Sequence, residues 1–342
     1  SSLIEIEDRC IQMGVPYQKV RDYLKLLAKE YNPVKEWIES VPWDGTSRLQ
    51  DFLNTIQSPN EPLKEMLMTK WLIGCVAAAC EPNGVSLEGI LVFQGAQGLG
   101  KTLWFKRLAD YEKGWLLEGA TLNPNDKDSV KQVVSHWIAE LGELGSTFKR
   151  ADIDSLKQFT GKKVDELRLP YDRASTTYQR RTAFYGSVNE REFLIDTTGN
   201  RRFWVVAVTA INASHGIDMQ QLWAEIKETL YQKESWYLNA EEREMLQNSN
   251  ETYRTQSTVE DLILEHVHFQ SQNTKPTQMT KLLRDLGISQ PRMPDIKDAS
   301  RVLAQFGLEP RKSNGKKVYD LDYTKVEIGS ADKFSDSWGK DF

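Results

Sequence analysis

The feature that most constrains the fold is a complete phosphate-binding loop in the first third of the chain. Residues 95–102 read Gly-Ala-Gln-Gly-Leu-Gly-Lys-Thr. An apolar run at 90–93 precedes the loop, and a segment with helical spacing of apolar residues, 103–108, follows it. Strand, glycine-rich turn and helix are the context that this motif requires. The chain is therefore expected to contain an α/β nucleotide-binding domain.

The residues of this loop predict specific contacts with a nucleotide. Glycines let backbone N–H groups approach the phosphates, and the helix that follows adds partial positive charge. Lys101 is expected to reach the β- and γ-phosphates from a solvent-facing position, and the Thr102 hydroxyl to bind Mg²⁺. ATP and Mg²⁺ are thus the expected cofactors. The expected nucleotide-binding residues are Gly95, Ala96, Gln97, Gly98, Leu99, Gly100, Lys101, Thr102 and Leu103.

Composition limits the other possibilities. A chain of 342 residues is expected to form two or three domains. Its net charge of −5 argues against a protein that coats nucleic acid by bulk charge, so DNA contacts are expected to use local basic patches. The most apolar run, 71–80, is half a membrane span. The chain opens without a signal-peptide pattern, and three cysteines without metal spacing fit a reducing compartment, so we expect a cytoplasmic protein.

Changes in periodicity along the chain predict three domains and a tail. Residues 1–86 carry helical periodicity, which includes expected helices near 20–27 and over 62–80. Over 87–250, β-rich runs at 90–94, 133–140, 183–188 and 203–208 alternate with helical ones, which is typical of a parallel sheet. Over 251–329, three helical segments and two strands around Lys312-Ser313-Asn314-Gly315 predict a winged-helix domain. Residues 330–342 are polar and expected to be disordered.

An acidic site is expected beside the phosphate loop, because an ATPase needs carboxylates to hold Mg²⁺ and to polarise water. Glu140 ends an apolar strand and Glu143 follows in the turn. We assign Glu140 to Mg²⁺ and Glu143 to water. The reverse division is open, as is a simple helix-capping role for Glu143.

Two further segments carry candidate catalytic residues. Asn189 follows the apolar strand 184–188, where its amide can contact the γ-phosphate or the attacking water; turn formation is the alternative. Arg201 and Arg202 lie between a turn and another apolar strand, where one of them can reach a neighbouring subunit's nucleotide. A solvated or salt-bridged arginine pair is the alternative for these two residues.

Basic residues between the acidic strand and Asn189, and others in the C-terminal hairpin, suit contacts with a phosphate backbone. Lys162 and Lys163 are expected at a loop tip within a basic stretch that also contains Arg180 and Arg181. An ordinary solvated surface is the alternative. The expected DNA-binding residues are Lys162, Lys163, Arg168, Arg173, Lys312, Lys316 and Lys317. The four histidines are scattered, and we interpret them as structural.

Taken together, these segments resemble the virulence-associated E family of phage and mobile-element replication proteins, which is grouped with the superfamily 3 helicases. The segments that carry the resemblance are 41–45 (Val-Pro-Trp-Asp-Gly), 95–102, 137–144, 162–165, Arg168, 170–171, 188–190 and 198–204 (Thr-Gly-Asn-Arg-Arg-Phe-Trp). The resemblance implies an AAA+-type ATPase core that forms a ring, with a homo-hexamer expected, and that moves on DNA. Family members often carry an upstream primase domain, so a primase and other replication proteins are expected partners.

The leading interpretation is an ATP-dependent DNA helicase or helicase-like replication-initiation ATPase, with ATP bound between subunits and single-stranded DNA in the pore. One alternative is an ATP-switched initiator or regulator that binds duplex DNA through its winged helix without unwinding it. A P-loop kinase is a further alternative, which leaves Asn189 and the arginine pair without a role.

Overall fold

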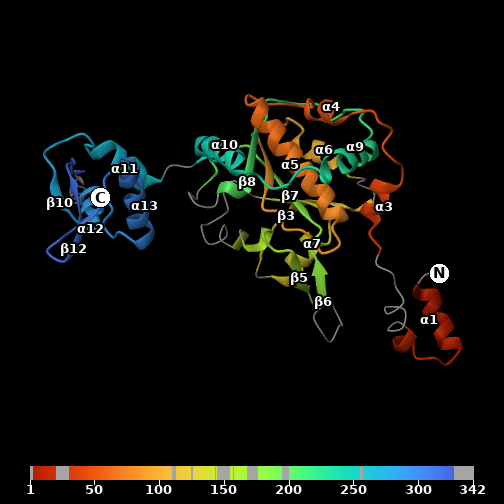
Figure 1. Ribbon diagram of the computed structural model, residues 1–342. Coiled ribbons are helices and arrows are strands. Elements are labelled where there is room, and N and C mark those ends of the chain that lie inside the picture. Colours follow the sequence, from red (N-terminus) through yellow and green to blue (C-terminus); the bar gives the residue numbers. More distant parts are fainter. Residues whose placement is uncertain are drawn as a thin grey trace, which may run out of the picture. The chain divides into compact units, whose positions relative to one another are not determined.

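The computed structural model describes residues 3–20, 31–109, 113–124, 126–142, 144, 155–156, 158–167, 176–194, 200–254 and 257–326. The chain divides into two compact units, Ser1–Arg254 and Thr255–Phe342. The unit boundary follows α10 (Ala240–Asn250) and a short 3-10 turn, η4 (Glu251–Tyr253). Each unit has a hydrophobic core of its own, and Figure 1 labels helices and strands of both units.

A five-stranded sheet forms the centre of the first unit. Its strands stand in the order β3 (Leu116–Ala120), β4 (Ile138–Leu141), β7 (Ala183–Val188), β2 (Ile90–Gln94) and β8 (Phe203–Ala207). All neighbouring strands pair in parallel. The central strands are apolar and buried because helices and loops cover both faces of the sheet. The expected α/β class with a parallel core is confirmed.

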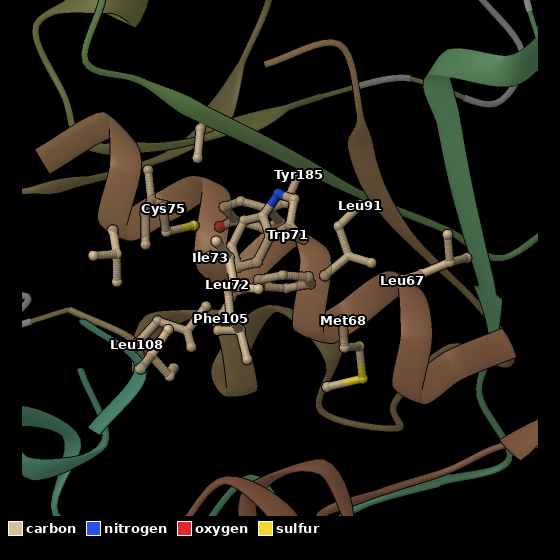
Figure 2. Close-up of a cluster of buried hydrophobic side chains, with 14 of the residues drawn as sticks. Leu67, Met68, Trp71, Leu72, Ile73, Cys75, Leu91, Phe105, Leu108 and Tyr185 are labelled. Carbon is tan, nitrogen blue, oxygen red and sulfur yellow. The ribbon is translucent and has the colours of Figure 1, made fainter. Parts of the chain in front are cut away.

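One face of the sheet is covered by α3 (Pro33–Glu39), α4 (Leu49–Leu53), α5 (Glu61–Cys80), α6 (Lys101–Lys106) and α9 (Met219–Ile226). The helix α5 is apolar around most of its circumference and is accordingly buried between its neighbours. Figure 2 shows side chains of α5 packed with Leu91 of β2, Phe105 of α6 and Tyr185 of β7. The rings of Phe105 and Tyr185 stack with centroids 3.8 Å apart, which holds α6 against β7.

The other face of the sheet carries α7 (Lys127–Val134) and the segment around 155–160. Strand residues that point to this face alternate with those that point to α5. The expectation of a strand over 133–140 is wrong in its first half. The Asp126 side chain accepts hydrogen bonds from the N–H groups of residues 128 and 129 and starts a helix, so the strand begins only at Ile138.

Smaller elements complete the first unit. A hairpin of β5 (Val164–Leu167) and β6 (Thr176–Gln179) precedes β7, and β1 (Ile56–Gln57) pairs with β9 (Ala210–Ile211) (Figure 1). A π-helical turn, η3 (Lys227–Tyr231), follows α9. At the start of the chain lies α1 (Leu3–Gln12). Most of the helix expected near 20–27 lies outside the described residues.

The helix expected over 62–80 is present as α5. Its N-terminus is set by Asn60, whose side chain accepts a hydrogen bond from the N–H of Leu63. Residues of α3, α4 and α5 share one hydrophobic core with the sheet. A boundary between a helical domain and an ATPase domain at residue 86 stays a prediction. In the described part of the chain, no helix has the length and apolar character needed to cross a membrane.

The second unit contains α11 (Thr258–His266), α12 (Met279–Asp285) and α13 (Met293–Gln305), which pack around Ile263, Leu282 and Leu303. A three-stranded antiparallel sheet of β10 (Lys275–Thr277), β12 (Lys316–Leu321) and β11 (Arg311–Ser313) accompanies them. The sequence analysis missed β10. Asn314 and Gly315, with φ of 48° and 73°, form the two-residue turn between β11 and β12.

Candidate functional site

The phosphate loop joins the end of β2 to the start of α6, and its glycines are required by its geometry. Gly98 and Gly100 have φ of 86° and 87°, in the left-handed region that favours glycine. A Cβ atom on Gly95 would lie 2.4 Å from the carbonyl oxygen of Val208. The loop is therefore held in a tight conformation between two strands.

The side chain of Lys101 folds back into this loop. Its Nζ donates hydrogen bonds to the carbonyl oxygens of Gly95 (2.6 Å) and Ala96 (2.9 Å) and to Oδ1 of Asn189 (2.9 Å). The expectation of a solvent-facing lysine is wrong, because Lys101 is only 7% exposed. Burial lowers the pKa of its ammonium group. The structure thus brings together the loop lysine and the amide of Asn189, two residues that the sequence predicted separately.

Glu140 lies on β4. In the strand order, β4 and β7, which ends just before Asn189, are on the same side of β2, the strand that leads into the phosphate loop. Its buried carboxylate accepts hydrogen bonds from the backbone N–H of Gly119 and from the Ser187 hydroxyl, both at 3.1 Å. Burial raises the pKa of this carboxyl group. The sequence analysis missed Ser187. Ser187 lies two residues before Asn189, so on an extended chain the two side chains point to the same side. This spacing is the sequence signal that identifies Ser187 as a candidate site residue.

Strand β7 connects the two sets of contacts because it lies between β4 and β2. Ser187 contacts Glu140, and Asn189 contacts Lys101. Residues two apart on an extended chain are about 7 Å apart on one face. The Glu140 carboxylate and the Lys101 ammonium group therefore lie at the same edge of the sheet, joined through Ser187 and Asn189 of one chain segment.

Oxygen donors are what Mg²⁺ prefers, and Thr102, which is half-buried, and Glu140, which is buried, both supply them. Among the described residues there is no cluster of three or more His, Cys, Asp or Glu side chains that would hold a metal ion. Thr102 and Glu140 therefore fit a cation that takes most of its ligands from phosphates and water, as Mg²⁺ does in nucleotide sites.

Arg201 and Arg202 lie at the opposite edge of the sheet, where the strands β2 and β8 begin. They end a 3-10 turn, η2 (Asn200–Arg202), just before β8, whose first residue pairs with the first residue of β2. The strand β2 separates the two arginines from the phosphate loop. From its first to its last residue, four residues further on, an extended strand spans about 13 Å. Asn250 of α10 holds the turn by donating hydrogen bonds to the carbonyl oxygens of Asn200 (2.8 Å) and Phe203 (2.9 Å).

The two arginines differ in their surroundings. Arg201 is exposed and lines a cavity of about 190 Å³ together with Lys70, Arg243 and Trp236. Arg202 is half-buried, and burial lowers the pKa of its guanidinium group. Arg201 is therefore the one with its charge presented outward.

Lys162 and Lys163 are exposed, as a DNA contact requires, but they do not lie at a loop tip. They precede β5 at the open end of the β5–β6 hairpin, where the carbonyl oxygen of Lys163 accepts a hydrogen bond from the N–H of Arg180 (2.7 Å). Residues 168–175 join β5 to β6 in the sequence. Arg168 and Arg173 are in that segment, which lies outside the described residues, as does Glu143.

Arg180 and Arg181 are structural and do not belong to a basic DNA-binding surface. Arg180 is 2% exposed, forms a two-pronged ion pair with Asp165 (2.5 and 2.6 Å) and lies over the ring of Phe159. Arg181 donates a hydrogen bond to the carbonyl oxygen of Glu81 (2.8 Å). Counting charges along the sequence could not separate these two residues from the exposed lysines.

In the second unit, Lys312, Lys316 and Lys317 are exposed on the β11–β12 hairpin. Lys312 and Lys317 are directly opposite each other in the strand register. Facing like charges destabilise a hairpin, so this pair suits contact with an anion. Arg311 is excluded from that surface because it pairs with Asp320 (2.5 and 2.7 Å).

Residues 41–45 position the start of α4 and are not part of the phosphate-loop site. Asp44 pairs with Arg48 and its N–H donates to the side chain of Gln221 on α9 (2.9 Å). The buried carboxylate of Glu225, also on α9, accepts hydrogen bonds from the Ser47 hydroxyl and the N–H of Arg48, just before α4, and from the N–H of Leu49, its first residue.

No curated protein sequence matches the chain. Among solved structures, the apo structure of the NrS-1 C-terminal region (305–718) is similar with a TM-score of 0.49 and 12% sequence identity, over 86% of this chain and 79% of that one. Its A form is similar with a TM-score of 0.46 and 12% identity, over 84% of this chain and 78% of that one.

One protein-family model matches most of the first unit. The model of the virulence-associated protein E-like domain matches residues 38–255, which is more than half of the 342 residues. The matched range contains the phosphate loop, Glu140, Asn189 and the arginine pair. The chain therefore belongs to the virulence-associated protein E-like family.

Proposed function

We propose that this protein is an ATP-dependent DNA helicase, or a helicase-like replication-initiation ATPase, of a phage or mobile element. Its first unit contains an AAA+-type ATPase core over residues 87–250, after a helical domain over 1–86, and its second unit is a winged-helix DNA-binding domain. Subunits form a ring, with six expected, and ATP and Mg²⁺ bind between them. Membership of the virulence-associated protein E-like family supports this proposal.

The observation that carries the proposal is the convergence of Lys101, Glu140 and Asn189 at one edge of the sheet. Lys101 binds the β- and γ-phosphates after it leaves the carbonyl oxygens that now hold it. Glu140 and Thr102 would hold Mg²⁺, which would supply charge neutralisation at the transferred phosphoryl group. Asn189 is then released from Lys101 and contacts the γ-phosphate or the attacking water. Glu143 is proposed to polarise that water.

An arginine from the neighbouring subunit completes the site. Within one subunit, Arg201 and Arg202 are a strand length away from the phosphate loop, so they have no route to their own nucleotide. Arg201 is exposed and is therefore proposed as the residue that stabilises charge on the neighbour's γ-phosphate. Arg202 holds the turn.

DNA contacts come from two separate surfaces. The β5–β6 hairpin, with Lys162 and Lys163, contacts the backbone of single-stranded DNA in the pore, and Arg168 and Arg173, between β5 and β6 in the sequence, are proposed to take part. The facing lysines of the β11–β12 hairpin contact duplex DNA. The second surface also favours a second candidate function, an ATP-switched initiator that binds duplex DNA without unwinding it.

The test compares the wild-type protein with Lys101→Ala in ATP hydrolysis, with and without single-stranded DNA, and in displacement of a strand from a forked duplex. We expect DNA-stimulated hydrolysis and displacement in the wild type and neither in the variant. Because Lys101→Ala removes three hydrogen bonds, its melting temperature is measured first. Normal turnover in the folded variant would refute the assignment of the ATPase site to this loop, and stimulation without displacement would favour the switch.

A further inference from the structure

Glu140 is a buried carboxylate that has no ion pair within the described part of the chain. It is 7% exposed, and its two oxygen atoms accept hydrogen bonds from neutral donors, the N–H of Gly119 and the hydroxyl of Ser187. Lys106, whose charge acts on this carboxyl group, forms its own ion pair with Glu118 (2.8 Å). A buried charge is costly unless it is paired or coordinates a metal. A carboxylate in this position therefore suits a cation from outside the chain.

Ser187 lies on the face of the sheet that α6 covers. Its side chain points to the same side of β7 as Tyr185, two residues before it, and the ring of Tyr185 stacks on Phe105 of α6. Thr102 is three residues before Phe105, so the two side chains are on the same side of α6. Because α6 starts at the phosphate loop, beyond the carboxyl end of β2, Thr102 lies further toward the carboxyl ends of the strands than Phe105 does. Ser187 is displaced from Tyr185 in that same direction, so the two hydroxyl groups lie at one edge of the sheet.

The two strands beside β4 fix the Glu140 carboxylate from both sides. The N–H of Gly119 reaches it from β3, where the pairing with β4 shifts register between Leu117 and Ala120 and Gly119 has a φ of 58°. The hydroxyl of Ser187 reaches it from β7. Each carboxylate oxygen accepts one of these bonds and retains a second lone pair. The carboxylate therefore cannot rotate without breaking a hydrogen bond, yet it can still bind a cation.

We propose that Ser187 is a positioning residue for the cation site, because its hydroxyl holds the Glu140 carboxylate in the orientation that binds Mg²⁺ together with Thr102. Hydrogen-bond partners that orient a metal ligand typically change metal affinity about 10–100-fold when they are removed. The inference rests on the proposed function, because it takes Glu140 and Thr102 to hold Mg²⁺ beside a bound nucleotide. It adds a residue that acts on the metal through another side chain.

The test measures binding of a non-hydrolysable ATP analogue by calorimetry, first with EDTA and then across a range of Mg²⁺ concentrations. Ser187→Ala removes the hydroxyl, Ser187→Cys replaces it with a weak donor, and Ser187→Thr keeps it. The matched control is Ser135→Ala, because the Ser135 hydroxyl donates to the carbonyl oxygen of Lys131 (2.6 Å) just after α7 and before β4 begins. A melting curve first shows that each variant is folded.

We expect Ser187→Ala to need about tenfold more Mg²⁺ than the wild type for half of the metal-dependent gain in affinity for the analogue. Ser187→Cys is expected to shift the Mg²⁺ requirement in the same direction by a smaller factor. Both variants are expected to bind the metal-free analogue as the wild type does. Ser187→Thr and the Ser135→Ala control are expected to need the same Mg²⁺ concentration as the wild type.

Four outcomes overturn the proposal. If the folded Ala and Cys variants respond to Mg²⁺ as the wild type does, the Ser187 hydroxyl does not position a metal ligand. If they lose the same affinity with and without Mg²⁺, Ser187 acts on the phosphate loop through Asn189. If the wild type binds the analogue but Mg²⁺ does not raise its affinity, the cation site fails while nucleotide binding stands. If the wild type binds no analogue under either condition, the proposed ATPase function fails together with this inference.

Discussion

The two edges of the parallel sheet hold their charged side chains very differently. At the phosphate-loop edge, Lys101 and Glu140 are buried, and each makes hydrogen bonds to backbone and side-chain atoms of the same unit. At the opposite edge, Arg201 and Lys162 are exposed, and none of the ion pairs between described residues includes them. The first edge holds its charges in hydrogen bonds within the unit, whereas Arg201 and Lys162 of the second edge present their charges to solvent.

The largest effect that would test this comparison is on Arg201. We expect Arg201→Ala to lower ATP turnover by roughly 10³-fold while ATP affinity changes less than about twofold, because the arginine acts on a neighbour's nucleotide. Steady-state hydrolysis and nucleotide binding are measured side by side. Arg243→Ala, which changes another cation of the same cavity, is the control and is expected to retain turnover. A parallel loss of affinity in Arg201→Ala would place it in its own subunit's site.

A second test concerns Arg180, which is a basic residue near that edge but is satisfied internally. Arg180→Ala leaves the Asp165 carboxylate buried without its partner, so the free energy of unfolding is expected to fall by about 3–5 kcal/mol. Urea denaturation measures this fall. Arg181→Ala, which loses hydrogen bonds to backbone carbonyl groups, is expected to cost about 1 kcal/mol. Weaker DNA binding by an equally stable Arg180→Ala protein would return that residue to the DNA surface.

The exposed lysines at the open end of the β5–β6 hairpin give a smaller effect. The double variant Lys162→Ala/Lys163→Ala is expected to lower the slope of log affinity against log salt by up to about two units for single-stranded DNA. Basal ATP hydrolysis is expected to stay unchanged, because both residues are remote from the phosphate loop. The same salt dependence is measured for the double variant Lys312→Ala/Lys317→Ala as the comparison. An unchanged slope for the first pair would identify Lys162 and Lys163 as ordinary solvated surface.

The smallest expected effect is on the stability contributed by Glu140. Since burial raises the pKa of its carboxyl group, ionisation is less favourable in the folded protein than in the unfolded chain. The stabilising contribution is complete below the ordinary carboxyl pKa and is lost as pH rises through the raised value. Glu140→Gln cannot ionise, so its stability relative to the wild type is expected to rise between pH 4 and 8, by less than about 1 kcal/mol. Thermal melts across this range measure it, and a pH-independent difference would contradict the assignment.

Sequence patterns predicted the first edge better than the second, for a physical reason. The loop glycines, Lys101 and the ends of apolar strands obey local rules, and parallel strands bring their carboxyl ends to one edge. That Lys101 folds back onto Asn189, and that Ser187 bonds Glu140, depends on strand order, which periodicity does not give. Likewise, exposed Lys162 and buried Arg180 look alike as charges in a sequence. Only packing against Phe159 and Asp165 separates them.

The most direct test of the central claim, that one ATP site is built from two edges of two subunits, mixes two inactive variants. Lys101→Ala lacks a working phosphate loop, and Arg201→Ala lacks the arginine of the opposite edge. ATP hydrolysis is measured for each protein alone and for co-assembled mixtures, with co-assembly verified by differential tagging. The account predicts that mixing restores part of the wild-type turnover, because some interfaces pair an intact loop with an intact arginine. Verified mixed assemblies with no recovered turnover would contradict it.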